Sequence, residues 1–137
     1  ICIFWTESGM AAWYDDPCFD DASDMAGGLY QFRGDSWRRL QQLKERGVLC
    51  GRVVEVAGVT FRKAAIDDVV RAGVGAATLE AEPDNKYDSN AIKVKVNGAH
   101  VGYIPARMAM RLHTSSVTPH VCSIAGGPKP HVWLVLA

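Results

Sequence analysis

The stretch that decides the fold runs from Ile92 to Ile104 and reads IKVKVNGAHVGYI. On both sides of Asn97-Gly98, apolar residues alternate with polar residues or glycine. This dipeptide is the strongest short signal for a two-residue hairpin, because both turn residues tolerate positive φ. The sequence therefore predicts an antiparallel hairpin whose register is set by the turn. The predicted cross-strand pairs are Val96 with Ala99, Lys95 with His100, Val94 with Val101, Lys93 with Gly102 and Ile92 with Tyr103.

Further strand and helix patterns lie on either side of this hairpin. Upstream, alternating β-branched residues predict one long strand over Val48–Phe61, with a bend at Gly51 or Gly58. The other predicted elements are a helix at residues 62–72 with Ile66, Val69 and Val70 inward and Gly73 as its stop, a strand at 77–82, a helix at 106–113 that follows Pro105 and buries Met108 and Leu112, and strands at 117–124 and 131–136. Together they indicate a mainly β fold with two or three short helices, arranged as a small, partly open antiparallel barrel.

The first third of the chain has weaker patterns. Its expected elements are a short strand at residues 1–5, a loop at 6–34, and a helix at 36–46 with Trp37, Leu40 and Leu43 along one side. We therefore divide the chain into an N-terminal extension with one helix, residues 1–48, and a β-barrel domain, residues 49–137. The tryptophans of the extension are expected to pack against the barrel or a second copy; they are Trp5, Trp13 and Trp37.

The composition limits the classes of function. With 137 residues, of which 48% are hydrophobic, the chain can form one compact core or one domain plus an extension. No apolar run reaches the ~18–20 residues that span a bilayer, so no membrane partner is expected. The net charge is zero, but residues 50–137 hold ten basic and seven acidic residues, which suits a local phosphate site. Because the chain does not begin with Met, we expect a fragment or processed product of a longer protein.

Cysteine and acidic residues give little support for metal chemistry. The four cysteines form no Cys-x-x-Cys pair, which favours free, mostly buried thiols in a reducing cytoplasm. A zinc site that uses His120 and Cys122 has no supporting spacing. The acidic loop lacks the pattern of a calcium loop; its residues are Asp15, Asp16, Asp20 and Asp21. We therefore expect no cofactor and no metal.

Catalysis is likewise not expected. Four carboxylates near the predicted hairpin could act in metal-dependent phosphodiester cleavage; they are Glu80, Glu82, Asp84 and Asp88. No nucleophile with an adjacent base and no phosphate-binding glycine loop accompanies them. The sequence therefore favours a binding module over an enzyme.

Three separated motifs surround and include the hairpin. They are VAGVTF at residues 56–61, EPDNKYDSNAI at 82–92 and VGYIP at 101–105. In this order they resemble the HIRAN domain, a module found in the helicase-like transcription factor and in many bacterial and phage proteins, over residues 50–137. The resemblance, to the bacterial or phage type, implies a modified OB-like barrel that binds single-stranded DNA or DNA 3′ ends without catalysis. It also implies that the domain targets a larger DNA-processing machine, such as a helicase or nuclease on the same or another chain, in DNA repair or at a replication fork.

Several residues of these motifs have the chemistry for such binding. The rings of Phe61, Tyr87 and Tyr103 can stack on bases. The Asp88 carboxylate can accept a hydrogen bond from a 3′-hydroxyl and would repel a 3′-phosphate. The Asn85 amide suits a base edge or sugar. The full set of candidate DNA-binding residues is Thr60, Phe61, Arg62, Asn85, Tyr87, Asp88, Asn90, Lys93, Tyr103 and Arg107.

The same residues also allow purely structural roles. Phe61 can cap the barrel, and Tyr103 can belong to the core because it shares a predicted hairpin face with Ile92. Asp88 and Asn90 can bond to the loop backbone, as such residues commonly do in turns. Lys95 and His100 can form a solvated strand face.

The chain also departs from the family's eukaryotic pattern. Thr60 stands where a basic residue precedes the aromatic, and Ala106 stands where a lysine is expected, next to Arg107. The aromatic that follows Phe61 in that pattern is also absent. These changes remove positive charge and stacking.

The alternative function is a protein-interaction module that uses the barrel edge or the tryptophan-rich extension.

Overall fold

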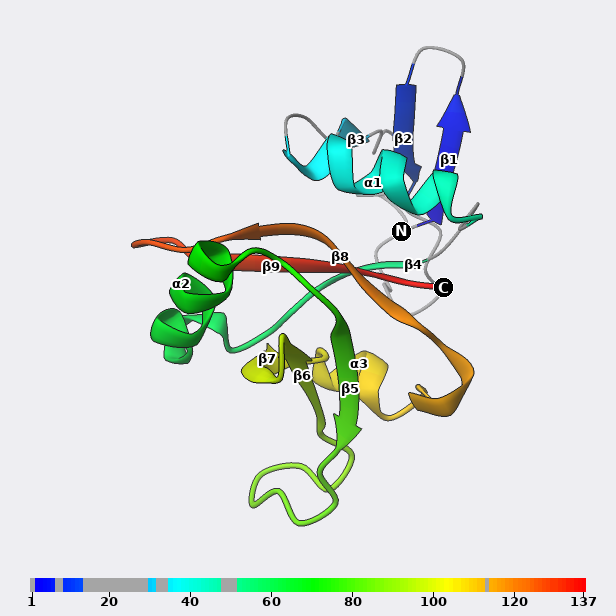
Figure 1. The fold of residues 1–137 in the computed structure, drawn as a ribbon. Coiled ribbons are helices and arrows are strands. Elements are labelled where there is room, and N and C mark those ends of the chain that lie inside the picture. Colours follow the sequence, from blue (N-terminus) through cyan, green and yellow to red (C-terminus); the bar gives the residue numbers. More distant parts are fainter. Residues whose placement is uncertain (1, 7–8, 14–29, 32–34, 48–51, 113) are drawn as a thin grey trace.

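Two antiparallel sheets form the fold in a computed structural model, which describes residues 2–6, 9–13, 30–31, 35–47, 52–112 and 114–137 (Figure 1). The six-stranded sheet has the order β3 (Tyr30–Gln31), β2 (Gly9–Trp13), β1 (Cys2–Thr6), β4 (Arg52–Glu55), β9 (His131–Leu136) and β8 (Pro119–Ala125). The three-stranded sheet consists of β5 (Ala77–Ala81), β6 (Ile92–Val96) and β7 (Ala99–Tyr103). In the described part of the chain the two sheets do not close into a barrel, which confirms the prediction of a mainly β, partly open fold.

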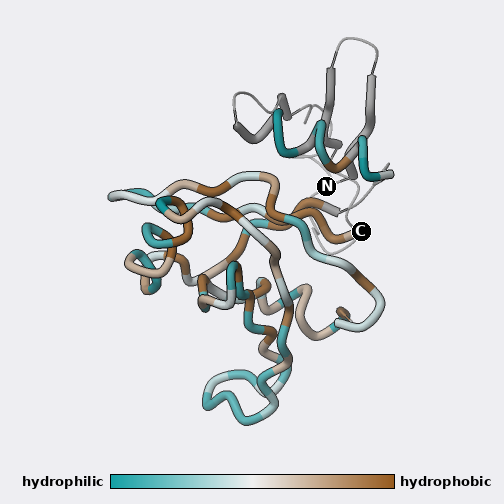
Figure 2. The backbone as a smooth tube through the Cα atoms, in the orientation of Figure 1, coloured by the Kyte–Doolittle hydropathy of each residue, from teal (hydrophilic) through white to brown (hydrophobic). Residues whose placement is uncertain are grey.

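Short helices complete the described structure. They are α1 (Asp35–Glu45), α2 (Lys63–Ala72), α3 (Ala106–Ala109) and two 3₁₀ turns, η1 (Val59–Phe61) and η2 (Thr114–Ser116). Of the helices in the described ranges, none is long and apolar enough to cross a membrane. In Figure 1 the loop between β5 and β6 extends away from both sheets, and Figure 2 shows that it is mostly hydrophilic.

The core lies where α2 meets strands of both sheets. Ile66 and Val69 of α2 are buried, as predicted, and Val94, Val101 and Leu134 are fully buried around them. The prediction that Val70 points inward is wrong, because its side chain is 45% exposed. Successive helix residues are turned by about 100°, so burial of Val69 directs Val70 away from the core.

An isolated bridge joins the end of β4 to β7. The Ala57 N–H donates to the Tyr103 carbonyl at 2.8 Å, and the Tyr103 N–H donates to the Ala57 carbonyl at 2.9 Å. Glycine is required at position 102 because a Cβ there would collide with the Ala57 carbonyl oxygen and lie 2.5 Å from Val56 Cγ1. This close approach places the segment after β4 directly beside the hairpin.

The hairpin turn is confirmed, but its predicted register holds only next to the turn. Asn97 and Gly98 have φ values of 54° and 80°, as a type I′ turn requires. The observed pairs are Val96 with Ala99, Lys95 with His100, Val94 with Gly102 and Lys93 with Tyr103. The predicted pairs Val94–Val101, Lys93–Gly102 and Ile92–Tyr103 are wrong because a β-bulge inserts Val101 as an extra residue in β7.

Two predicted elements differ in extent. Within the described residues, the long strand predicted for 48–61 is only β4 plus the bridge at Ala57, because Gly58 with φ 73° starts the η1 turn. The helix predicted for 106–113 ends at Ala109, although Met108 is buried as expected and Leu112 packs partly against the core. The other predicted strands and helices in residues 62–136 are confirmed within a few residues at their ends.

The N-terminal part contains more strand than predicted. The 6–34 loop prediction is wrong at β2 and β3, because β2 pairs with β1 on one side and with β3 on the other; residues 14–29 lie outside the described ranges. β1 meets β4 through Cys2 and Arg52, and α1 packs against β8. The predicted helix at 36–46 is confirmed by α1. The domain division at residues 48/49 stays a prediction.

Candidate functional site

The loop that follows β5 is held by its own side chains. The side-chain oxygen Oδ1 of Asn85 accepts hydrogen bonds from the backbone N–H groups of Tyr87 at 2.9 Å and Asp88 at 3.0 Å. The Asp88 carboxylate accepts from the Asn90 N–H at 2.9 Å. Such side-chain to backbone bonds fix a turn that has no sheet ladder to support it. The loop is therefore preorganised, and this order directs Tyr87 outward.

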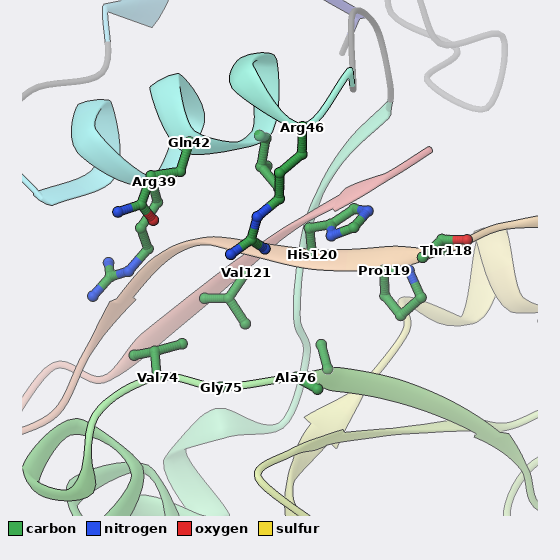
Figure 3. A pocket seen from close by; sticks show the side chains of 12 residues that line it. Arg39, Gln42, Arg46, Val74, Gly75, Ala76, Thr118, Pro119, His120 and Val121 are labelled. Carbon is green, nitrogen blue, oxygen red and sulfur yellow. The ribbon is translucent and has the colours of Figure 1, made fainter.

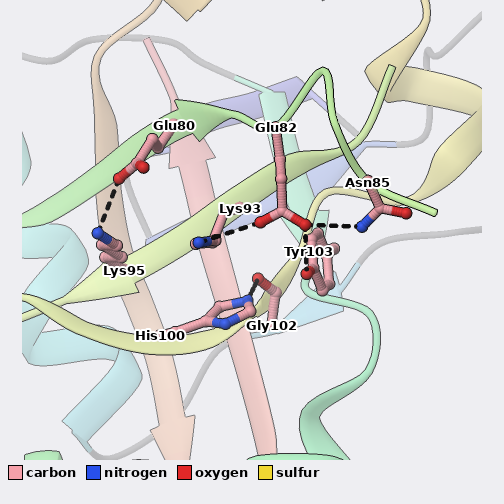
Figure 4. A network of polar contacts seen from close by, with 8 residues as sticks. All are labelled: Glu80, Glu82, Asn85, Lys93, Lys95, His100, Gly102 and Tyr103. Carbon is pink, nitrogen blue, oxygen red and sulfur yellow. Dashed lines mark hydrogen bonds and ion pairs between the residues drawn. The ribbon is translucent and has the colours of Figure 1, made fainter. Parts of the chain in front are cut away.

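Glu82 is the centre of the polar network beside this loop (Figure 4). Its Oε1 accepts from the Asn85 side-chain amide at 2.8 Å and from the Tyr103 hydroxyl at 3.2 Å. Its Oε2 pairs with Lys93 Nζ at 3.0 Å. One carboxylate thus joins the loop, β6 and β7. The hydrogen bond from Asn85, followed by that from Lys93, lowers the pKa of Glu82.

A second ion pair lies next to the first on the same sheet face. Lys95 Nζ lies 2.7 Å from Glu80 Oε2, and the Glu80 side chain is 54% exposed, against 21% for Glu82. The hydrogen bond that Lys93 donates to Glu82 raises the pKa of Lys93, and the one that Lys95 donates to Glu80 lowers the pKa of Glu80. Both lysines of β6 are therefore matched by carboxylates, so this face is close to charge balance.

His100 and Tyr103 extend the network along β7. Their rings meet edge to face, with centroids 4.8 Å apart and an interplanar angle of 87°. His100 Nε2 lies 2.9 Å from the Gly102 carbonyl oxygen, to which it donates when it carries the proton. Burial, and then the nearby Arg62 guanidinium, lowers the pKa of His100, which favours the neutral ring.

Two aromatic rings project from the surface without packing against the core. The side chains of Phe61 in η1 and Tyr87 in the loop are 88% and 95% exposed. Each ring has a cationic neighbour in sequence, Arg62 beside Phe61 and Lys86 beside Tyr87. Within the described residues, neither cationic side chain makes an ion pair. Both rings therefore leave a π-face open to solvent, on which a flat ligand group can stack.

A shallow hollow lies between the Tyr87 loop and the ends of β5 and β6. Its volume is about 400 Å³, and the lining includes Glu82, Asn85, Tyr87 and Lys93. The lining thus combines Glu82 and two of its partners, Asn85 and Lys93, with the Tyr87 side chain. This arrangement can receive a flat, polar group such as a base with its sugar.

The structure brings most of the predicted site residues to this region. Lys93 and Tyr103 meet at Glu82, and Asn85, Tyr87, Asp88 and Asn90 lie in the adjacent loop. Thr60, Phe61 and Arg62 lie in or directly after η1, which contacts β7. Arg107 is exposed on α3 and makes no hydrogen bond or ion pair to the network in the described part of the chain.

Two members of the network, Glu82 and His100, were not among the predicted site residues. A signal for Glu82 exists in the sequence, because Glu80-x-Glu82 and Lys93-x-Lys95 alternate on strands that become neighbours. Opposite charges on facing strands favour cross-strand ion pairs. His100 has no comparable signal, since its contact with Tyr103 depends on the bulge at Val101.

Metal ligation finds no support in the described residues. They contain no group of three or more His, Cys, Asp or Glu side chains able to hold a metal ion. Burial raises the pKa of the Cys122 thiol to about 12, which opposes the thiolate that zinc requires. The predicted acidic loop at residues 15–21 lies outside the described ranges.

Comparison with protein families identifies the domain. A model of the HIRAN domain family matches residues 52–127, more than half of the chain. The chain belongs to the HIRAN domain family. HIRAN domains are nucleic-acid-binding modules and generally non-catalytic, and the matched segment contains every predicted site residue. No curated protein and no solved structure matches the chain.

Proposed function

We propose that this HIRAN domain binds single-stranded DNA, with its 3′ end at the Tyr87 loop, and acts without catalysis. The observation that carries the proposal is the pair of exposed rings, Phe61 and Tyr87, beside the preorganised Glu82 network. Each ring is adjacent in sequence to a cation that makes no ion pair with the described residues. Stacking on an aromatic ring stabilises a bound base by about 1–3 kcal/mol regardless of sequence. The neighbouring cations suit the phosphates on either side of a stacked base.

The 3′-end preference rests on Asp88. Its Oδ1 accepts the Asn90 N–H, which fixes the carboxylate in the loop next to Tyr87. A carboxylate held in this way can accept from a terminal hydroxyl, and it repels a terminal phosphate. Lys93 and Lys95 form ion pairs with glutamates. In this proposal Arg62 and Lys86 therefore contact the phosphates, and Lys93 holds Glu82 in place.

Such a domain would deliver a larger DNA-processing protein, such as a helicase or nuclease, to DNA ends. The test is fluorescence anisotropy with a labelled strand of about ten nucleotides, a length that an OB-like surface covers. The strand is offered with a 3′-hydroxyl, with a 3′-phosphate and as a blunt duplex, each at two salt concentrations. We expect the tightest, most salt-sensitive binding to the 3′-hydroxyl strand. Absence of binding to all three would contradict the proposal and favour the protein-interaction alternative.

A further inference from the structure

A second pocket lies between α1 and β8, away from the Tyr87 loop (Figure 3). Its volume is about 490 Å³. It reaches the chain just before β5, whereas the Tyr87 loop follows the other end of that strand. An occupant of this pocket and an occupant of the Tyr87 loop would therefore contact opposite ends of β5.

One face of α1 supplies the upper wall of this pocket. Arg39, Gln42, Leu43 and Arg46 line it at the spacing i, i+3, i+4 and i+7, which places them on one side of a helix. A helix face that packs against a sheet is normally apolar, as Leu43 is here. Figure 3 shows the arginine side chains extending from α1 toward β8 on this face, where apolar residues are the rule.

Positively charged side chains line the pocket. Arg39 is half-buried and Arg46 lies at the exposed rim, and His120 of β8 lines the opposite wall. Among the described residues no carboxylate lines the pocket, and neither arginine makes an ion pair with any of them. Burial, and then the charge of Arg46, lowers the pKa of His120. Two guanidinium groups that line one pocket repel each other unless an anion lies between them.

We propose that this pocket binds the phosphate group of a nucleotide. Guanidinium groups bind phosphate oxygens through paired, charge-assisted hydrogen bonds, and the Gln42 amide adds a further donor. Leu43, Val74 and Val121 offer an apolar wall for the attached sugar or base. The volume falls in the range of about 300–1,000 Å³ that is typical of small-ligand sites. This inference does not rest on the proposed function, since it uses residues at the other end of β5.

The test is a titration with inorganic phosphate, a nucleoside monophosphate and the matching nucleoside, followed by calorimetry and by ¹H–¹⁵N spectra of the arginine and histidine side chains. We expect saturable binding of the monophosphate, weaker binding of phosphate and no binding of the nucleoside. The spectral changes should centre on Arg39, Arg46 and His120. A strand with a 5′-phosphate, compared with the same strand lacking it, separates a strand end from a free nucleotide as the source of the phosphate.

Variants give the decisive comparison. The double variant Arg39→Gln/Arg46→Gln should weaken binding of the monophosphate by about tenfold or more, as expected when charged hydrogen bonds are lost. Lys129→Gln, which removes one exposed positive charge outside the pocket, is the matched control and should change it little. Unchanged binding in the double variant would overturn the inference. If that variant does not fold, spectral changes in the wild type that avoid these three residues, or no saturable binding, would overturn it instead.

Discussion

The Tyr103 hydroxyl donates to Glu82 Oε1 at 3.2 Å, and it reaches that oxygen because β7 contains a bulge. In the regular register Tyr103 would pair with Ile92 and share the core face. The extra residue, Val101, shifts Tyr103 opposite Lys93, so its ring lies on the polar face beside His100. A single inserted residue therefore exchanges the faces of the residues that follow it. The candidate site depends on this exchange.

Substitution of Gly102 should show how much the close packing of β7 against Val56 and Ala57 contributes to the free energy of unfolding. In Gly102→Ala the new methyl group collides with the Ala57 carbonyl and with Val56. We expect a loss of about 1–3 kcal/mol in the free energy of unfolding, the usual cost of overpacking. Urea denaturation measures it. A loss below about 0.5 kcal/mol, the range of ordinary surface changes, would mean that the strands separate easily at this point.

Neutralising Glu82 should destabilise the protein and change its acid response. The folded-state pKa of Glu82 is lowered from its ordinary value of 4.5, so its contribution is present above that pH and is lost as pH falls through the lower, folded value. Thermal melts of Glu82→Gln should therefore show a lower melting temperature near neutral pH and a flatter acid limb below about pH 4.5. Glu80→Gln is the control, with a smaller effect because Glu80 is more exposed. Equal effects of the two changes would contradict the central role of Glu82.

His100 should make stability fall in mild acid. Its folded-state pKa is lowered from its ordinary value of 6.5, so the unfolded chain binds the proton more tightly than the folded one. Stability therefore increases as pH rises through the interval between the folded value and about 6.5, and decreases on acidification across the same interval. Melting temperatures measured between about pH 5 and 8 should show this slope, and His100→Gln should reduce it. An identical slope in the variant would show that His100 does not titrate in this way.

The exposed rings should matter for binding and not for stability. Phe61→Ala and Tyr87→Ala should each weaken binding of single-stranded DNA by about five- to a hundredfold, which corresponds to the loss of one stacked base. Their melting temperatures should stay close to that of the wild type, since both rings are almost fully exposed. Met110→Ala, which removes another exposed apolar side chain, is the control for binding. Anisotropy on all three variants compares them directly, and equal affinities would remove stacking from the account.

The charge of Asp88 should set the 3′-end preference. Asp88→Asn keeps an oxygen that can accept the Asn90 N–H, so the loop conformation is retained. Without the negative charge, discrimination between a 3′-hydroxyl and a 3′-phosphate strand should disappear, while overall affinity stays similar or rises. Competition between the two strands measures the ratio. A preserved preference in this variant would assign end recognition to another group.

Local sequence signals predicted the parts of the fold that depend on local chemistry. Asn97-Gly98 specifies its turn through backbone conformation alone, and the turn is further held by Asn97 bonds to Gly73 and Gly75. The bulge at Val101 could not be predicted, because it responds to the approach of Ala57 from a distant part of the chain. β2 was missed because its sequence, GMAAW, lacks the β-branched residues and the alternation that mark a strand.

The sequence indicated most of the residues that lie at the candidate site, but not the contacts that these residues make with one another. Tyr87 lies in a loop rich in turn residues, which predicts a surface position, and its side chain is almost fully exposed. The alternating glutamates and lysines indicate ion pairs, but the pairing of Lys93 with Glu82 depends on the neighbouring positions and register of β5 and β6, which these patterns do not fix. A ligand contact by Asn85 stays a prediction, and what the sequence did not indicate is that its amide oxygen and nitrogen hold the loop and Glu82.

The most direct test of the DNA-binding face is to map the surface that a strand contacts. Backbone ¹H–¹⁵N spectra recorded during titration with a short single strand bearing a 3′-hydroxyl report each amide separately. We predict that the largest shifts occur at residues 59–62 and 84–90, around Phe61 and Tyr87, with smaller changes at His100 and Tyr103. Shifts confined to α1 and β8, or no shifts at all, would contradict the account.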